Sequence, residues 1–302
     1  MKVLVTGSTG FVGRWLVEEL EAAGHRPERT PRSSELDIQD ADALARHIAR
    51  CRPDAVAHLA GVAFAPDALR NREQAVRINV GGTQALFTAL EAADCQVPVL
   101  VAGSADVYGF PRPSDLPLTE NAPLLAKHPY GLSKLGQEAV ARSSALRSGV
   151  PLAVTRSFNH AGPGQRDVFV APALARRVLE ARRLGDPTVR VGNVDVRRDL
   201  TDVRDVARAY RLLLELLVER RPREPLVVNV ASGRSISIRE LLALIGAAAG
   251  IEPRIVVDPA LVRPDDPPEI VGDASLLRSL TGWQPAIPLE RTIADLVASL
   301  DG

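Results

Sequence analysis

A glycine-rich segment close to the N-terminus constrains the fold of this chain more than any other feature. Residues 6–13 read TGSTGFVG and place glycines at positions 7, 10 and 13. The segment joins a short apolar run, Lys2–Thr6, to a stretch with apolar residues at helical spacing, Phe11–Ala23. Such a turn lets the backbone approach a pyrophosphate and aims the free N–H groups of the helix at the phosphates. The segment therefore predicts a dinucleotide-binding strand–loop–helix unit, with a tight turn that binds no ligand as the alternative.

The alternation of strand and helix continues through the first half of the chain. Short aliphatic runs predict strands, and apolar residues at helical spacing follow them. Repeated strand–helix–strand units form a parallel sheet with helices on both faces. The predicted strands are Asp54–Ala60, Val97–Ser104 and Leu152–Arg156, and the predicted helices are Asp40–Arg50, Arg72–Ala93 and Tyr130–Ser148.

The character of the sequence changes after the turn-rich segment Asn159–Gln165. A predicted helix, Val168–Leu184, is followed by mixed short strands and helices. We therefore predict the α/β class, with a Rossmann-type doubly wound parallel sheet and a smaller α/β substrate-binding lobe. The expected dinucleotide-binding domain is 1–165, rejoined by 197–231, and the expected lobe comprises 166–196 and 232–302.

The charge balance and the cysteines exclude several classes of protein. The 302 residues contain 37 Lys and Arg against 37 Asp and Glu, whereas nucleic-acid coats and membrane-surface proteins usually carry a basic excess. No apolar run reaches the roughly 18–20 residues that span a bilayer, and the N-terminus lacks a signal-peptide pattern. Cys51 and Cys95 are isolated and fit neither a disulfide framework nor a zinc site. We expect a cytoplasmic protein without a metal and without a nucleic-acid or membrane partner.

The segment His25–Ser34 bears on the choice of dinucleotide. An acidic residue at the end of the second strand would bind the ribose hydroxyls of NAD, but this segment contains three arginines and a single glutamate. Guanidinium groups beside hydroxyl residues suit a 2′-phosphate, so NADP(H) is favoured over NAD(H), with Arg32 as the candidate ligand. A solvated charged loop is the alternative. Asp37 is better placed for the adenine end than for the ribose.

Tyr130 and Lys134 form a second constellation. They lie four residues apart in a predicted helix, so the phenol and the ammonium share one face. The pKa of a free tyrosine is near 10, and a fixed cation nearby lowers this pKa by favouring the phenolate. The chain has only three lysines among its 37 basic residues, and one of them stands here. The pair predicts a tuned acid–base group, with an exposed pair on an amphipathic helix as the alternative.

Ser104 ends the predicted strand Val97–Ser104, at the start of the sequence SADVYG. Ligands of parallel sheets bind at the carboxyl ends of the strands, so Ser104 should face the same crevice as the glycine loop. A hydroxyl there can donate to a substrate carbonyl and stabilise a developing alkoxide. Ser104 is therefore a candidate catalytic residue, with a simple turn cap as the alternative.

Together these segments resemble the extended short-chain dehydrogenase/reductase family, the NAD-dependent epimerases and dehydratases. The resemblance covers the whole chain, and its motifs stand in the order of the family. They are TGxxGFxG at 6–13, HLAG at 58–61, Asn79 before Gly82-Thr83, SxxVYG at 104–109 and YxxxK at 130–134.

Three later segments are similar to one branch of this family, the GDP-4-keto-6-deoxy-D-mannose reductases. They are 156–165 (RSFNHAGPGQ), 191–205 (VGNVDVRRDLTDVRD) and 258–266 (DPALVRPDD). The resemblance implies NAD(P)H-dependent reduction of a 4-keto nucleotide sugar to GDP-D-rhamnose or GDP-6-deoxy-D-talose. A 4-epimerase or 4,6-dehydratase with tightly bound NAD is one alternative, and a dinucleotide-sensing regulator without chemistry is another.

The resemblance also implies roles for individual residues. Tyr130 would donate the proton, Lys134 would tune it and anchor the ribose, and Ser104 would hold the substrate carbonyl. Arg198 would meet the diphosphate of the substrate, unless it forms a surface ion pair with Asp199 or Asp202. The implied cofactor-binding residues are Gly7, Thr9, Gly10, Phe11, Val12, Gly13, Arg32, Asp37, Ile38, Leu59, Ala60, Gly61, Asn79, Tyr130 and Lys134. The implied substrate-binding residues are Ser104, Asp106, Asn159, His160, Arg198 and Arg263, although His160 could equally make a structural hydrogen bond.

Two positions depart from the family pattern. Gly103 stands where many relatives have a second serine, and Asp106 stands where dehydratases carry a glutamate that acts as a base. Aspartate is one methylene shorter, and a general base must first be within reach of its proton, so dehydration is disfavoured. The family also implies a homodimer formed through the helices at Arg72–Ala93 and Tyr130–Ser148.

Overall fold

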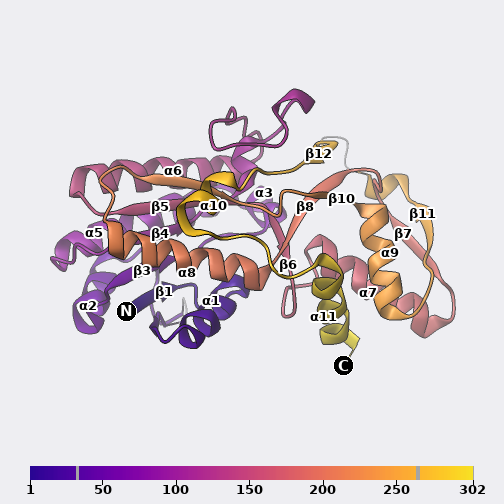
Figure 1. Ribbon diagram of the computed structural model, residues 1–302, viewed down its shortest axis with the longest axis horizontal. Helices are drawn as coiled ribbons and strands as arrows, with labels where there is room; N and C mark the ends of the chain where they lie inside the picture. The colour runs from indigo at the N-terminus through magenta and orange to yellow at the C-terminus, as the bar shows by residue number, and fades with distance from the viewer. Residues whose placement is uncertain (32–33, 263–265, 302) are drawn as a thin grey trace.

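The computed structural model describes residues 1–31, 34–262 and 266–301 and confirms the predicted α/β class. Six parallel strands form the main sheet, which occupies the left part of Figure 1. In spatial order they are β2 (Arg26–Arg29), β1 (Lys2–Thr6), β3 (Ala55–His58), β4 (Val99–Ala102), β5 (Leu152–Ser157) and β9 (Leu226–Val230).

Helices cover both faces of the main sheet because its strands are apolar on both sides. Successive side chains of a strand point to opposite faces, and in β1 Val3 and Val5 belong to one apolar cluster whereas Leu4 belongs to another. The first cluster is covered by α1 (Phe11–Ala22) and α8 (Val203–Arg220). The second is covered by α2 (Ala41–Cys51), α5 (Gly82–Ala92) and α6 (Pro129–Ser148). The main body is therefore a three-layer arrangement (Figure 1).

The long helix predicted at Arg72–Ala93 is interrupted. The structure forms α4 (Arg72–Val76), one π-helical turn η1 (Arg77–Gly81), and then α5. Within the turn, Asn79 uses its side chain to bind the backbone of Val62, whose amide donates to Asn79 Oδ1 at 2.8 Å. This long-range contact holds the widened turn against the segment after β3, and hydrophobic spacing carries no information about it. A short helix, α3 (Ala65–Arg70), lies between β3 and α4 in the sequence.

A second set of elements lies to the right in Figure 1 and has its own apolar core. Its centre is β8 (Arg197–Asp202), which pairs with β6 (Asn159–Ala161), β10 (Ser235–Ser237) and β12 (Glu269–Ile270). Nearby, β7 (Thr188–Val191) pairs with β11 (Arg254–Val257), and three helices pack together: α7 (Val170–Leu184), α9 (Ile238–Ala249) and α11 (Leu289–Asp301). Within 197–231, therefore, α8 and β9 join the main body whereas β8 lies in the smaller sheet.

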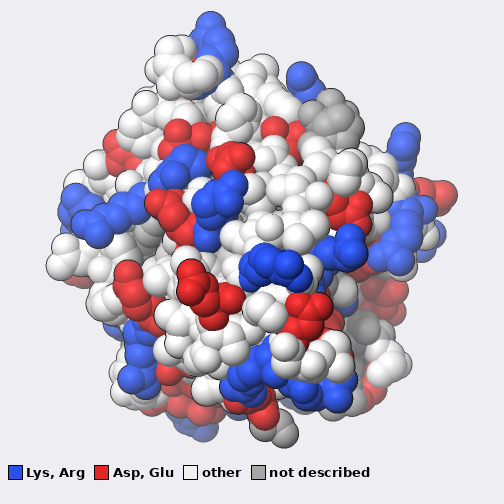
Figure 2. Space-filling view, turned by 90° about the vertical axis from the view of Figure 1, so that its right-hand side faces the viewer, with Lys and Arg blue, Asp and Glu red and all other residues white. Residues whose placement is uncertain are grey.

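The remaining elements are short. They are the 3₁₀ turns η2 (Ala105–Tyr108), η3 (Pro113–Asp115) and η4 (Pro259–Leu261), and the helix α10 (Ser275–Thr281). None of the described helices combines the length and apolar character needed to cross a lipid bilayer. Figure 2 shows the face at the right-hand end of the molecule, where acidic and basic side chains are interspersed.

A buried ion pair joins α6 to β5 beneath the carboxyl end of the sheet. Arg156 binds Glu138 through two hydrogen bonds, Nε to Oε2 at 2.9 Å and Nη2 to Oε1 at 2.7 Å. The two side chains are 4% and 3% exposed, so water cannot compensate either charge. Arg156 also donates to the Tyr108 hydroxyl at 3.2 Å, and Tyr108 in turn donates to Asn229 Oδ1 at 2.7 Å. The pair therefore connects β5, α6, η2 and β9.

Replacing Arg156 with methionine should lower the free energy of unfolding by about 3–5 kcal/mol, because it removes the buried, hydrogen-bonded countercharge of the Glu138 carboxylate. Urea unfolding followed by circular dichroism measures this loss.

The matched control is Arg142→Met. Arg142 lies 3.7 Å from the same carboxylate but is 50% exposed, so its removal should cost less than about 1 kcal/mol. Equal losses in the two variants would contradict the importance of the buried pair.

Candidate active site

The glycine loop has the geometry of a phosphate cradle. Gly7 has a φ of +71°, and its carbonyl accepts from the amide of Gly10 at 2.9 Å. An added Cβ at Gly13 would lie 2.1 Å from the oxygen of Gly7, and one at Gly7 would lie 2.7 Å from the amide nitrogen of Ala60. Among the described residues, no side chain caps the N-terminus of α1, and none binds the buried Ser8 hydroxyl. The loop thus offers unused donors to an anion in a place too narrow for side chains, which fits a pyrophosphate.

The sheet places this loop at its topological switch point. β2 lies on one side of β1 and β3 on the other, so the chain reverses its direction of winding between β1 and β3. In doubly wound sheets, ligands bind in the crevice at this point, beyond the carboxyl ends of the strands. The glycine loop follows β1, the HLAG motif ends β3 and Ser104 follows β4. The structure therefore brings these three predicted segments to one edge of the sheet.

His58 holds the HLAG segment against the glycine loop. Its Nδ1 forms a hydrogen bond with the Thr6 hydroxyl at 2.8 Å, and the Ala60 amide donates to the same hydroxyl at 3.2 Å. Burial, together with the charge of Lys134, lowers the pKa of His58 to about 3. The imidazole is therefore neutral, and its role is to position the backbone of two cofactor-binding candidates, Leu59 and Ala60.

Ser104 and Tyr130 form the centre of the candidate site. Ser104 caps η2 by accepting from the Asp106 amide at 3.1 Å. Tyr130 is a buried residue in the first turn of α6, directly after Pro129. Burial raises the pKa of Tyr130, the Asp106 carboxylate raises it further, and the Ser104 hydroxyl opposes the shift. The phenol is therefore protonated at neutral pH, the state that a proton donor requires.

The spacing predicts that Lys134 lowers the pKa of Tyr130, but the structure does not show this effect. Its side chain is 6% exposed, and its ammonium donates to the Ala102 carbonyl at 2.9 Å and to Gln137 Oε1 at 2.8 Å. Burial lowers the pKa of Lys134 to about 8. The ammonium is therefore turned to the end of β4 and to its own helix, and burial outweighs any cationic influence on the phenol.

Asp106 and Arg198 come from distant segments, and the charge of Arg198 acts on the Asp106 carboxylate. Burial raises the pKa of Asp106, although its side chain is 40% exposed, and the charges of His128 and Arg198 oppose this shift. Arg198 forms an ion pair with Asp266 and donates to the Pro267 carbonyl at 2.8 Å. Arg198 forms no ion pair with Asp199 or Asp202, the two partners considered from the sequence. Arg198 therefore lies near the centre of the site and is held by a carboxylate.

The other predicted residues lie around this centre. His160 makes the structural hydrogen bond, Nδ1 to the Phe158 carbonyl at 3.0 Å, and its ring also stacks on Phe11 at the start of α1, with centroids 5.9 Å apart. Asn159 is exposed on β6. Asp37 is exposed and accepts from the Gln39 amide at 2.9 Å, and Ile38 packs against Gly82. Arg32 and Arg263 fall outside the described residues.

Three polar residues of the site, Ser133, Gln137 and His128, were not anticipated. Ser133 and Asn79 bind each other, with Asn79 Nδ2 donating to Ser133 Oγ at 2.9 Å. Gln137 binds Lys134 and Thr83. His128 caps α6 by accepting from the Gly131 amide, and its other ring nitrogen, Nε2, lies 3.9 Å from the Asp106 carboxylate. Gln137 stands three residues after Lys134, a spacing at which helical side chains meet, so the sequence did contain a local signal for it.

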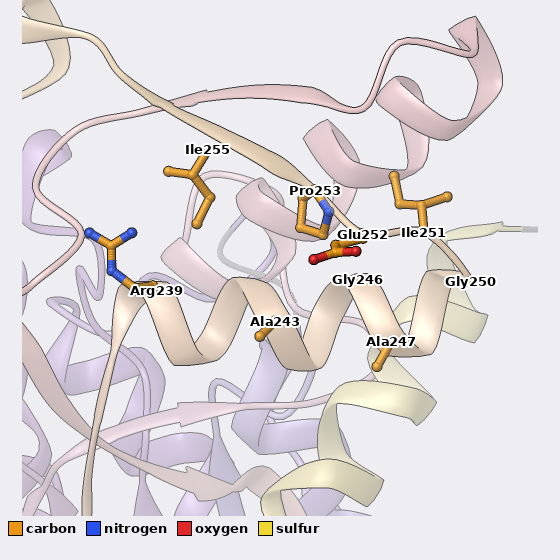
Figure 3. Close-up of a pocket in the computed structure, with 9 residues that line it drawn as sticks. All are labelled: Arg239, Ala243, Gly246, Ala247, Gly250, Ile251, Glu252, Pro253 and Ile255. Carbon is orange, nitrogen blue, oxygen red and sulfur yellow. The ribbon is translucent and has the colours of Figure 1, made fainter.

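A cavity of about 590 Å³ lies in the smaller body, between α9 and the segment that follows it (Figure 3). Arg239 stands at the start of the helix and Gly250 at its end, and small residues such as Ala243 and Ala247 form much of the wall. This cavity shares no residue with the candidate site.

The fold and the glycine loop define a nucleotide-binding protein of the Rossmann type. More specifically, the chain belongs to the NAD dependent epimerase/dehydratase family, whose sequence profile matches residues 3–231.

Individual relatives match nearly the whole chain. The GDP-6-deoxy-D-mannose reductase of Pseudomonas aeruginosa is 36% identical over 98% of this chain and 96% of its own. Among solved structures, RMD from Pseudomonas aeruginosa complexed with NADPH superposes with a TM-score of 0.89 at 34% identity, covering 99% of this chain and 98% of that one. The UDP-glucose 4-epimerase from Brucella ovis in complex with NAD superposes with a TM-score of 0.88 at 26% identity, covering 99% and 98%.

Replacing Gly13 with alanine should weaken NADPH binding at least about tenfold, because the new methyl group collides with the Gly7 carbonyl and forces the cradle open. Fluorescence titration of the purified variant measures the dissociation constant.

Gly81→Ala is the control, since an added Cβ at Gly81 meets nothing within 4 Å and its backbone is helical. The assignment of the cradle fails if Gly13→Ala is folded and binds NADPH as tightly as Gly81→Ala does.

Proposed function

We propose that this chain is a reductase that uses NADPH to reduce the 4-keto group of GDP-4-keto-6-deoxy-D-mannose, giving GDP-D-rhamnose or GDP-6-deoxy-D-talose. One observation carries the proposal. A protonated Tyr130, whose pKa is raised by burial and influenced by Ser104, lies at the sheet edge that also holds the glycine loop. The similarity to a GDP-6-deoxy-D-mannose reductase and to the NADPH complex of RMD supports the substrate and the cofactor.

The roles of the residues follow from their positions. NADPH, when bound, supplies the hydride for the carbonyl carbon. The glycine loop and the N-terminus of α1 hold the pyrophosphate, and Ser104 orients the carbonyl oxygen. Tyr130 then donates its phenolic proton to that oxygen, since burial and Asp106 keep this proton in place until the oxygen becomes basic. Lys134 contributes a positive charge beside the HLAG segment, with its ammonium 3.8 Å from the point that a Cβ added to Gly61 would occupy.

The nucleotide sugar would lie between the two bodies of structure. We assign its diphosphate to Arg198, with Asn159 and Arg263 as further candidate contacts and residues 166–196 and 232–302 as the lobe that holds it. Arginine suits this task because its planar fork pairs with two phosphate oxygens at once. Asp266, the present partner of Arg198, would then exchange places with a phosphate.

NADP(H) is the preferred cofactor in this proposal and NAD(H) the second choice. The similarity to an NADPH complex supports the first, and the similarity to a UDP-glucose 4-epimerase with NAD supports the alternative function. A 4-epimerase or 4,6-dehydratase would retain NAD during purification and would act without added NADPH. Asp106 argues against dehydration because its carboxylate is one methylene shorter than the glutamate of dehydratases.

The test is a coupled assay with GDP-mannose, a GDP-mannose 4,6-dehydratase, NADPH and this protein, with the product identified by NMR. The wild type should oxidise NADPH, and Tyr130→Phe should lower turnover by about 10²–10⁴ because it removes a positioned acid.

Tyr210→Phe is the matched control. Tyr210 is also a buried tyrosine, bound to Ser157 at 2.8 Å, but it belongs to the core between α8 and β5 and has the smallest of the named influences on the pKa of Tyr130. No NADPH oxidation by the wild type would refute the proposed substrate, and full activity of Tyr130→Phe would refute the proposed acid.

The same proposal includes a cytoplasmic homodimer. Three exposed leucines and one exposed valine lie on three helices of the main body, namely Leu69 on α3, Val76 on α4, and Leu132 and Leu146 on α6. Apolar side chains grouped on neighbouring helices are typical of an interface, and α3 and α4 both pack on α6. The two cysteines, Cys51 and Cys95, are unpaired, which suits a reducing compartment.

Light scattering after size-exclusion chromatography should give twice the chain mass of 32.4 kDa for the wild type. Leu132→Glu should give the mass of one chain, because it buries a charge in the proposed interface.

Leu184→Glu provides the comparison, since Leu184 is 64% exposed on α7 and lies outside the proposed interface. A wild type that elutes with the mass of one chain would contradict the homodimer.

A further inference from the structure

Lys134 carries a positive charge in a buried place, and the structure shows what holds it. Of its two hydrogen bonds, one goes to a backbone carbonyl, that of Ala102, and the other goes to the side chain of Gln137. Gln137 is 1% exposed. In the part of the chain that the structure describes, Lys134 makes no ion pair with a carboxylate. The ammonium is therefore bound by a neutral amide, where a buried cation is usually paired with a carboxylate.

The orientation of this amide follows from the number of protons available. The Thr83 hydroxyl donates to the Asn79 carbonyl at 2.8 Å, and a hydroxyl has only one proton to donate. Thr83 Oγ1 must therefore accept from Gln137, whose Nε2 lies 3.0 Å away. The NH₂ group of Gln137 then faces Thr83, and its oxygen faces the ammonium of Lys134. The reverse orientation would place two donors against each other.

The contacts continue from Asn79 to the start of α6. Asn79 lies in the π-helical turn, and its Nδ2 donates to Ser133 Oγ at 2.9 Å. Ser133 in turn donates to the carbonyl of Tyr130 at 2.8 Å. Asn79, Thr83, Ser133 and Gln137 are all at most 1% exposed, so each of these hydrogen bonds is made within the protein. Gln137 is thus fixed by a buried network that has one end at Lys134 and the other at the residue carrying the candidate acid.

We propose that Gln137 is a positioning residue for Lys134. Its amide oxygen, oriented by Thr83 and Asn79, holds the ammonium at the end of β4 and stabilises its charged form. The consequence for turnover rests on the proposed function, because there Lys134 must be charged and must face the HLAG segment. The effect on the ionisation of Lys134 does not depend on that function.

The groups around Lys134 determine the sign of the effect. On β3, His58 is neutral because its pKa is lowered to about 3, and on α6 the phenol of Tyr130 is protonated. Burial lowers the pKa of Lys134 to about 8, since it disfavours the charged form. An accepting oxygen stabilises the ammonium and opposes this shift. Losing that oxygen should therefore lower the pKa of Lys134 further, and a carboxylate in its place should raise it.

The experiment is an NMR titration of the protein labelled with ¹³C at the Cε of lysine. The chain has three lysines, Lys2, Lys127 and Lys134, so the spectrum has three signals, and Lys134→Arg identifies the third. The wild-type midpoint should lie near 8. Gln137→Met should lower it by about one pKa unit or more, the size expected for a lost hydrogen bond to a charged group. Gln137→Glu should raise it by a similar amount.

Gln84→Met is the matched control. Gln84 is exposed on α5, and within the described part of the chain its side chain binds Thr88 alone, at 3.4 Å, so this variant should titrate like the wild type. Unchanged midpoints in folded Gln137 variants would overturn the proposal. If Gln137→Met does not fold, Gln137→Glu tests the contact alone, because a carboxylate raises the pKa of Lys134 only if the side chain at position 137 lies against the ammonium.

Activity provides a separate readout. Under the proposed function, the alkaline limb of kcat/KM should move in the same direction as the NMR midpoint in each variant. A shifted midpoint in a protein that never reduces a keto sugar nucleotide would leave the role of Gln137 intact and refute the proposed function. A catalytically active wild type with unshifted midpoints in the variants would do the reverse.

Discussion

The buried pair of Arg156 and Glu138 is the interaction on which the geometry of the site depends. A charge enclosed in protein is tolerated only when its partner stays in place, so this pair strongly opposes any displacement of α6 from β5. Through Tyr108 the same guanidinium also restrains the turn after β4. Tyr130 starts α6 and Ser104 precedes that turn, so the two hydroxyl groups of the candidate site stand on elements that are fixed to each other.

Much of the main body could be predicted from the sequence because its signals are local. The strand predicted at Lys2–Thr6 has the same bounds in the structure, and the strand predicted at Leu152–Arg156 extends one residue further there. Glycines at fixed spacing between a strand and a helix have few other uses, and the rule for parallel sheets then places Ser104 at the same edge. The motifs needed only this local information.

The features that the sequence did not reveal depend on contacts between distant segments. The π-helical turn exists where Asn79 meets Val62, and Arg198 pairs with Asp266, which is far from it in the chain. The pKa of Tyr130 shows the limit most clearly. Spacing placed a cation one turn away, but the degree of burial and the direction of the Lys134 side chain decide the outcome, and neither is written in the YxxxK pattern.

The order of strands in the main sheet has a consequence for the newly made chain. All six residues of β5 are buried, and one edge of this strand is covered only by β9, which is made after the whole segment from Asn159 to Glu224. Until β9 leaves the ribosome, β5 presents an unpaired apolar edge, the kind of surface on which partly folded chains associate. Of the smaller body, β6, α7, β7 and β8 are made in the same interval, whereas α9 and α11 are made after β9. That body therefore cannot complete its own core until β9 is available to cover the edge of β5.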